Sequence, residues 1–110
     1  MIQLYQLMEE IAEFSDSTFG TEQRNPAIAW KLRDEVDELI EKLTIGTGDD
    51  HRANLLEEYA DCLILLLDSL RKSQFRADEL MAAARVKMKL NRKRKWGSPD
   101  ENGIIHHIKD

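Results

Sequence analysis

Four acidic residues, arranged in two pairs, are the part of this sequence best suited to chemistry. Glu35 and Glu38 are three residues apart, and so are Glu58 and Asp61. In a helix, this spacing places both members of a pair on one face. Each pair lies among apolar residues, where a carboxylate is costly unless a positive group meets it. Two such pairs on two helices could hold a divalent cation, which is typical of phosphate chemistry.

The ligand types restrict the choice of metal. All-oxygen ligands suit Mg²⁺, Mn²⁺ or Ca²⁺. A di-iron bundle would use Glu-x-x-His pairs, and none of the three histidines stands three residues after a Glu on an expected helix. Asp68 lies seven residues after Asp61 and therefore shares its helical face, but its role stays open. The alternative for these acids is salt bridging to a basic helix later in the chain.

A basic segment follows near the C-terminus. Residues 85–95 contain seven Lys or Arg and no acid. Lys87, Asn91 and Arg94 are spaced as i, i+4 and i+7, on one helical face. An ammonium, an amide and a guanidinium together suit a polyphosphate. The alternative is a basic helix end that complements the helix dipole.

Two tryptophans lie close in sequence to these groups. Trp30 precedes the first acidic pair, and Trp96 follows Arg94 by two residues. Either ring could stack on a nucleobase, but packing in the core is the favoured expectation.

The elements that must position these groups are helical. Apolar residues recur at spacings of three and four, which predicts helices ending near 15, then spanning 25–43, 51–72 and 77–95. Asn25 is expected to cap the second helix, and the Asp residues that end the Gly46–Asp50 break are expected to cap the third. The third helix is apolar on most sides and is expected to be central and buried. Residues 98–110 are expected to be irregular, and short connections favour antiparallel neighbours in an all-α bundle.

Length and composition limit the number of domains and the classes of partner that this protein can have. Its 110 residues predict one domain spanning 1–110, and the net charge of −5 argues against a nucleic-acid binder. The single cysteine, Cys62, excludes an intrachain disulfide and is expected to be a core residue. No signal peptide is evident, and the longest apolar run is six residues. We therefore expect a cytoplasmic protein with no membrane partner.

Two stretches resemble a known family. Residues 32–39 (Leu-Arg-Asp-Glu-Val-Asp-Glu-Leu) and 57–61 (Glu-Glu-Tyr-Ala-Asp) are similar to the E-E-x-x-E … E-x-x-D signature of the MazG-like all-α nucleoside triphosphate pyrophosphohydrolases. Residues 87–109 are similar to the end of the dATP/dGTP pyrophosphohydrolase-type branch, which also has an early Phe-Gly, here Phe19-Gly20. The resemblance covers residues 19–109.

The resemblance implies a MazG-like four-helix bundle, completed by forming a homodimer or homotetramer. It also implies hydrolysis of (deoxy)nucleoside triphosphates, with purine dGTP or dATP as the leading candidates, to the monophosphate and pyrophosphate. Mg²⁺ is the implied cofactor, with Mn²⁺ able to substitute. Carried over by position, the metal ligands are Glu35, Glu38, Glu58 and Asp61. The substrate contacts are Lys87, Asn91, Arg94 and Trp96.

Elementary chemistry is consistent with this activity. Glu35 or Glu38 would be the catalytic carboxylate that takes the proton of the attacking water. Lys87 and Arg94 would stabilise the charge that develops on the leaving pyrophosphate.

The chain departs from the family pattern at two positions. The first acid of the doublet is Asp34 rather than Glu, which leaves its role open. Lys31 stands where this branch often carries His. Any contact made from position 31 is therefore expected to differ.

A binding module is the alternative function. A helical domain with a basic fourth helix could bind nucleic acid or a protein partner. The two hypotheses differ in their expected complexes, since the enzyme needs a triphosphate substrate and forms no stable complex with nucleic acid.

Overall fold

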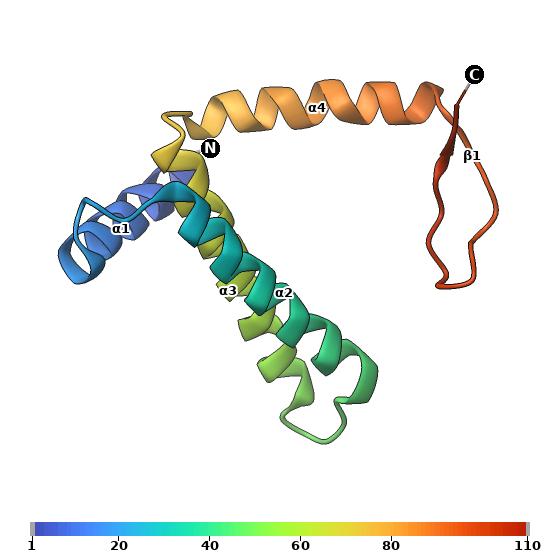
Figure 1. The fold of residues 1–110 in the computed structure, drawn as a ribbon, viewed down its shortest axis with the longest axis horizontal. Coiled ribbons are helices and arrows are strands. Elements are labelled where there is room, and N and C mark those ends of the chain that lie inside the picture. The colour runs from blue at the N-terminus through green and yellow to red at the C-terminus, as the bar shows by residue number, and fades with distance from the viewer. Residues whose placement is uncertain (1, 110) are drawn as a thin grey trace. The chain divides into compact units, whose positions relative to one another are not determined.

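The computed structural model describes residues 2–109 and confirms an all-α fold with four helices (Figure 1). In chain order the elements are α1 (Ile2–Phe19), α2 (Asn25–Ile45), α3 (His51–Lys72), α4 (Ala77–Lys93), β1 (Lys95–Trp96) and β2 (His107–Ile108). The chain divides into two compact units, one ending at Ala77 and the other beginning at Asp78. Each unit is described by itself.

Helix α1 is longer than its apolar pattern predicts. It continues to Phe19, whereas the sequence suggested an end near Ser15 and a polar loop from residue 16. The helix ends at Gly20, whose φ of 82° lies in the left-handed region and whose N–H donates to the Asp16 carbonyl at 3.1 Å. The apolar pattern missed this last turn because it is interrupted by three polar residues, Asp16, Ser17 and Thr18.

Helices α2 and α3 form an antiparallel pair (Figure 1). α2 begins at Asn25 as predicted, with Pro26 in its first turn. The expected cap is wrong, however, because the Asn25 side chain caps nothing and instead reaches α3. Its amide donates to Ser73 Oγ at 2.8 Å, and its Oδ1 accepts from Ser69 Oγ at 2.7 Å. The first turn of α2 is thereby fixed to the last turn of α3.

The α2–α3 connection differs from expectation in a similar way. α2 runs to Ile45, where Gly46 N–H donates to the Lys42 carbonyl at 3.0 Å. α3 covers the predicted residues, but the Asp50 side chain makes no capping hydrogen bond. Asp50 has a φ of −90° and a ψ of −1°, outside the extended conformation that side-chain capping needs.

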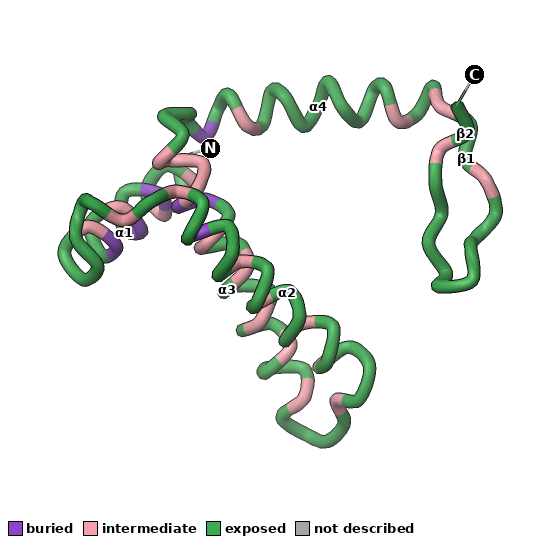
Figure 2. The backbone as a smooth tube through the Cα atoms, in the orientation of Figure 1, coloured by how far each residue is buried: buried purple, intermediate pink, exposed green. Residues whose placement is uncertain are grey.

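The core of the first unit is small. Its buried apolar side chains are Met8, Ile11, Ile28, Leu67 and Ala77. In Figure 2 the buried positions gather on α1 and on the adjoining part of α3. The expectation that α3 is buried on most sides is wrong for the single chain, because only Leu67 and Asp68 of this helix are buried. Leu56, for example, is 69% exposed.

Both tryptophans contradict the expectation of core packing. Trp30 is 63% exposed and Trp96 is 47% exposed. The Arg33 guanidinium lies 5.2 Å from the centre of the Trp30 ring, a cation–π contact at the surface.

Asp68 is buried because it is fully paired. Its Oδ1 accepts from Arg71 Nε at 3.0 Å and from Arg71 Nη2 at 2.6 Å, and its Oδ2 accepts from Ser15 Oγ at 2.8 Å. Arg71 also donates to Asp16. The network ties α1 to α3, which answers the question that the spacing of Asp68 left open.

The second unit consists of α4 and a short antiparallel strand pair. α4 ends at Lys93, two residues earlier than predicted. The tail expected to be irregular turns back on itself, so that Trp96 pairs with His107. Asp100 closes the turn, and the N–H of Ile104, the His106 ring and the N–H of Asn102 hold the pKa of its carboxyl below the ordinary value. Among residues 2–109, no helix is long and apolar enough to cross a membrane.

Candidate metal centre

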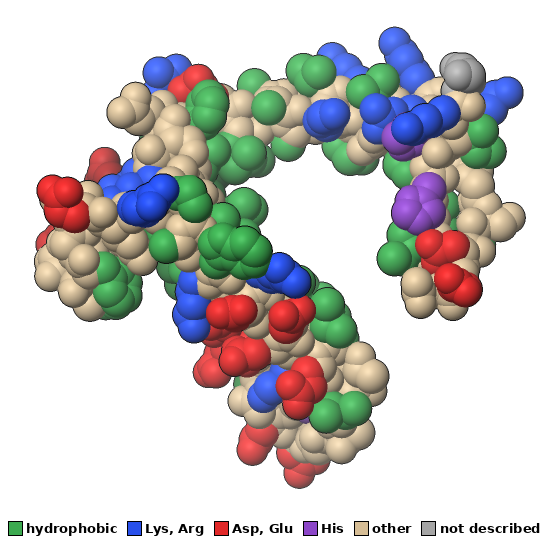
Figure 3. Space-filling model, in the orientation of Figure 1, with side chains coloured by type: hydrophobic (Ala, Val, Ile, Leu, Met, Phe, Trp, Pro, Cys, Tyr) green, Lys and Arg blue, Asp and Glu red, His purple; other side chains and the backbone are tan. Residues whose placement is uncertain are grey.

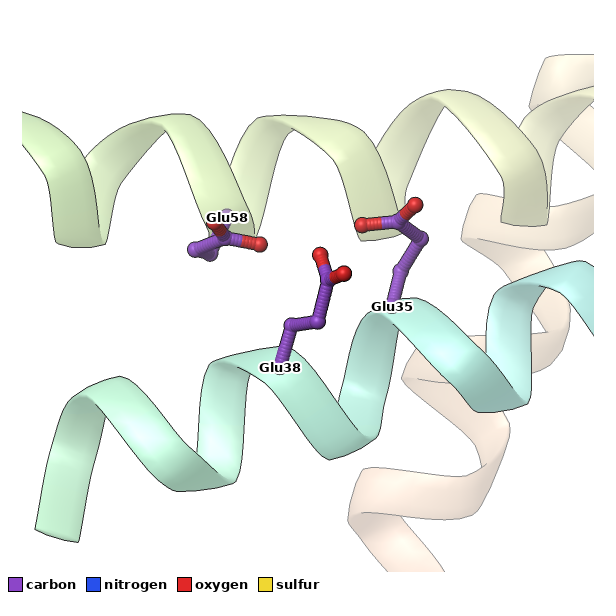
Figure 4. A group of neighbouring side chains, drawn as sticks. All are labelled: Glu35, Glu38 and Glu58. Carbon is purple, nitrogen blue, oxygen red and sulfur yellow. The ribbon is translucent and has the colours of Figure 1, made fainter.

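Three of the four predicted metal ligands meet between α2 and α3. Glu35 and Glu38 project from α2 and Glu58 projects from α3, with their carboxylates facing one another (Figure 4). One oxygen from each lies within 4.8 Å of the others. The doublet spacing puts the two α2 glutamates on one face, and the antiparallel pairing brings Glu58 opposite them. We call these three residues the glutamate group.

The charges of the glutamate group are poorly compensated. Lys31 Nζ lies 3.3 Å from a Glu35 oxygen, one turn away on α2. This hydrogen bond and the Glu35 charge raise the pKa of Lys31. The pKa of Glu38 is raised above its usual value, first because it shares a hydrogen bond with Glu35 and then because of the Glu35 charge. Figure 3 shows acidic side chains gathered over the same helix pair.

One atom of the group lacks any partner. Glu58 Oε2 is buried and has no hydrogen-bond partner. A buried carboxylate oxygen is costly when it is unpaired. A cation among the three carboxylates would satisfy it, and carboxylate oxygens are the ligands that Mg²⁺ and Mn²⁺ prefer. The residues present therefore fit a divalent metal.

Asp61, the fourth predicted ligand, is not part of the glutamate group. It is exposed and lies one turn beyond Glu58 on α3. Together with Glu35 it lines a neighbouring pocket of about 300 Å³. Asp34, whose role the sequence left open, is exposed on the outer side of α2, where its charge contributes to the raised pKa of Lys31.

The neighbouring pocket, which we call the α1 pocket, was not predicted. Helices α1, α2 and α3 line it with apolar side chains and a few polar groups: Ile11, Phe14, Ser15, Phe19, Lys31, Glu35, Asp61, Ile64, Leu65 and Asp68. Phe14 continues the apolar spacing of α1, which predicts packing in the core, and Ser15 carries no signal in the sequence. The spacing of Asp68 after Asp61 was the one hint in the sequence, because it extends the acidic face towards this pocket.

Three of the predicted substrate-binding residues come together in the second unit. Arg94 Nη1 donates to Asn91 Oδ1 at 3.3 Å, and Trp96 Nε1 donates to the Asn91 carbonyl at 2.9 Å. Lys87 lies one turn earlier on α4 and is exposed. Arg94 also lines a hollow of about 590 Å³ with Lys93, Lys95 and Lys109, among others. The unit therefore presents a cationic surface around Arg94.

Cys62 has no features of a nucleophile. Burial, together with the charges of Glu35, Asp61 and Glu58, raises the pKa of its thiol. The thiol therefore stays protonated at neutral pH and is a weak nucleophile.

Comparison with known proteins identifies one family. The family model described as dATP/dGTP pyrophosphohydrolase matches residues 7–110. That range extends over most of the first unit and the second unit, and it includes every residue discussed above as a metal ligand or substrate contact. In the same comparisons, no curated protein and no solved structure matches the chain.

Proposed function

Because this chain belongs to the dATP/dGTP pyrophosphohydrolase family, we propose that it hydrolyses purine deoxynucleoside triphosphates to the monophosphate and pyrophosphate, using Mg²⁺. The family name indicates a pyrophosphohydrolase. The observation that carries the metal-dependent mechanism is the glutamate group, with its buried and unpartnered Glu58 oxygen. The proposal treats residues 1–110 as one functional domain, since the family match runs through both units.

The metal would be held by Glu35, Glu38 and Glu58, with Asp61 as a fourth ligand reached by side-chain rotation. When bound, Mg²⁺ or Mn²⁺ supplies charge neutralisation for the triphosphate and makes water easier to deprotonate. Glu58 contributes the buried oxygen that has no other partner. Lys31 orients Glu35 through their ion pair.

Glu38 is the best placed general base. It is the exposed member of the glutamate group, so its carboxylate is accessible to the attacking water. In the proposed step, water attacks the α-phosphorus while Glu38 accepts a proton from it, and the bond to the oxygen bridging the α- and β-phosphorus breaks. Pyrophosphate leaves with that oxygen. Glu35 would be the second candidate for the same role.

The basic surface of the second unit would contact the substrate. Arg94 offers a fork of donors for phosphate oxygens and Lys87 a mobile point charge. Asn91 positions Arg94 through its amide oxygen, and the Trp96 ring is exposed for stacking. This part of the proposal is supported by the family match and by the charge of the segment.

We also propose that the chain works as a homodimer or homotetramer. Large apolar side chains of α2 and α3 are exposed, among them Ile40, Leu56 and Leu66. Large apolar side chains that remain in water favour association with a partner that covers them. A second copy of the same helix pair would cover it and complete the bundle that a single chain leaves open.

The direct test is pyrophosphate release from a panel of canonical and modified (d)NTPs. We expect release from dGTP or dATP in the presence of Mg²⁺, and no release when the metal is chelated. Release from pyrimidine triphosphates alone would contradict the purine assignment. No release from any triphosphate with either Mg²⁺ or Mn²⁺ would refute the enzyme and favour the binding module.

The metal-free protein is expected to lose stability as the pH rises, and bound Mg²⁺ is expected to restore it. In the metal-free protein, folding raises the pKa of Glu38 above its ordinary 4.5. The folded state then holds the proton more tightly than the unfolded state, so stability falls as the pH rises through this interval. Above it, Mg²⁺ should raise Tm by about 5 °C at roughly ten times its Kd.

Glu38→Gln tests both halves of this prediction. The variant should melt higher than the wild type without metal at neutral pH, and it should lose most of the Mg²⁺ shift. Glu41→Gln, an exposed glutamate one turn further along α2, is the matched control and should leave both unchanged. A wild-type Tm that does not respond to millimolar metal would contradict the site.

A further inference from the structure

We propose that the Lys31 ammonium fills part of the cation site of the glutamate group while the metal is absent, and that it turns to a phosphate oxygen of the triphosphate when the metal binds. Lys31 thereby makes the binding of the metal and the binding of the triphosphate depend on each other. The inference rests on the proposed function, because it assigns a role in the same site to a residue outside the acidic signature.

Lys31 stands on the same face of α2 as the two glutamates that this helix contributes to the group. Positions 31, 35 and 38 are spaced as i, i+4 and i+7. The Lys31 Nζ atom lies 3.3 Å from a Glu35 oxygen. Among residues 2–109, it is the one basic group that forms an ion pair with the glutamate group. Lys31 therefore offsets part of the charge that a divalent cation would otherwise neutralise.

The ion pair is easily broken on the lysine side. The Lys31 side chain is 59% exposed, whereas that of Glu35 is only 13% exposed. Glu35 points towards α3, and Lys31 reaches it from the solvent on a flexible four-carbon stem. A partly exposed pair of this kind is weak. A divalent cation on Glu35 takes up the charge that attracts the ammonium and repels the ammonium directly, so Lys31 leaves Glu35 when the metal binds.

The acids that attract Lys31 are mainly members of the glutamate group. The pKa of Lys31 is raised first by its hydrogen bond with Glu35 and by the Glu35 charge, and then by the charges of Asp34 and Glu38. With a metal on Glu35 and Glu38, Asp34 is the remaining acid of these three. Asp34 is exposed and lies outside the glutamate group. The released ammonium therefore favours a new anionic partner.

A triphosphate supplies that partner close to the metal centre. Lys31 lines the α1 pocket together with Glu35, so the released ammonium stays beside the glutamate group. A triphosphate bound at the metal is strongly anionic. An ammonium on a flexible stem suits its oxygens as a mobile point charge.

The exchange of partners couples the two ligands in both directions. Without triphosphate, Lys31 competes with the metal for Glu35. With triphosphate, the ammonium has another partner, so the metal binds more tightly. Because linkage is reciprocal, the metal strengthens triphosphate binding by the same factor.

Calorimetric titration with Mn²⁺ in the absence of nucleotide tests the competition for Glu35. Lys31→Met keeps most of the side-chain length but removes the charge, and we expect it to bind Mn²⁺ about three- to tenfold more tightly than the wild type. Lys31→Arg keeps the charge and should bind no more tightly than the wild type. Arg33→Met is the matched control, because it removes one charge from an exposed residue of the same helix that lies against Trp30. It should change the affinity by less than about twofold.

Titration with the α,β-imido analogue of dGTP at saturating Mn²⁺ tests the phosphate contact. The analogue resists hydrolysis at the α-phosphorus, so binding is measured apart from turnover. Lys31→Met should bind it about tenfold more weakly than the wild type, and Arg33→Met should not. In steady-state kinetics, Lys31→Met should raise KM by about tenfold while kcat changes by less than about threefold. A lysine that acted only by orienting Glu35 would lower kcat instead.

Unchanged or weaker Mn²⁺ binding by Lys31→Met would overturn the inference, and so would unchanged binding of the analogue. Both shifts without hydrolysis of any triphosphate by the wild type would refute the proposed function and leave the inference standing. Hydrolysis by the wild type, with neither shift in Lys31→Met, would do the reverse.

Discussion

Glu58→Gln is expected to lower the rate of pyrophosphate release at least about 1,000-fold. The substitution keeps the size of the side chain but removes the charge of the one glutamate whose oxygen is buried and unpartnered. An amide oxygen binds Mg²⁺ less strongly than a carboxylate, and the charge facing Glu38 is lost as well. The measurement is steady-state pyrophosphate release from the best substrate of the panel.

The fold should survive this change. Removing a charge from among three carboxylates relieves repulsion, so the metal-free variant should melt at the wild-type temperature or above it. Glu57→Gln is the matched control, because Glu57 is exposed, adjacent in sequence and outside the glutamate group. If Glu58→Gln kept a rate within tenfold of the wild type, Glu58 would not be a metal ligand.

Asp68→Ala is expected to destabilise the protein by about 3–5 kcal/mol. The Asp68 side chain is 7% exposed, and it takes three hydrogen bonds from Arg71 and Ser15. Its removal leaves the Arg71 guanidinium short of a partner in a setting where that side chain is only 22% exposed. The free energy of unfolding of a small domain is about 5–15 kcal/mol, so urea denaturation should show that the variant has lost a large part of it.

Asp16→Ala gives the comparison within the same network. Asp16 pairs with the same arginine, but its side chain is 37% exposed and its contacts are longer, at 3.2 and 3.4 Å. An exposed ion pair of this kind contributes about 1 kcal/mol or less. Similar losses from the two substitutions would show that burial does not govern the strength of this network.

Much of the fold could be predicted from local sequence. The bounds of α3 follow from its apolar run and from the Gly-rich turn before it, and Pro26 marks the start of α2. These signals are local, which is why they are reliable. The roles of Asn25 and Asp50 were predicted wrongly because capping is only one use of a polar side chain. For Asn25 a partner on another helix, invisible to local sequence, competes for the same hydrogen bonds.

The site was predictable where spacing implies proximity. Glu35, Glu38 and Glu58 meet because a three-residue interval is one helical face and because short connections make neighbours antiparallel. Ser15 could not have been predicted, since its contact with Asp68 joins positions 53 residues apart in the chain. The exposure of Trp30 could not be predicted either. An aromatic side chain favours burial, but its hydrophobicity does not say which surface it will pack against.

The hydrogen bonds of Asn25 set the axial register of α2 against α3. Apolar ridges on two helices can slide past one another by a turn and still interdigitate. A side-chain amide held between Ser69 and Ser73 has no such freedom, in the way that one buried Asn fixes the alignment of a coiled coil. Glu35 lies ten residues further along α2, roughly 15 Å away. A neutral contact at one end of the helix pair therefore decides which acids stand opposite each other near its middle, although it touches none of them.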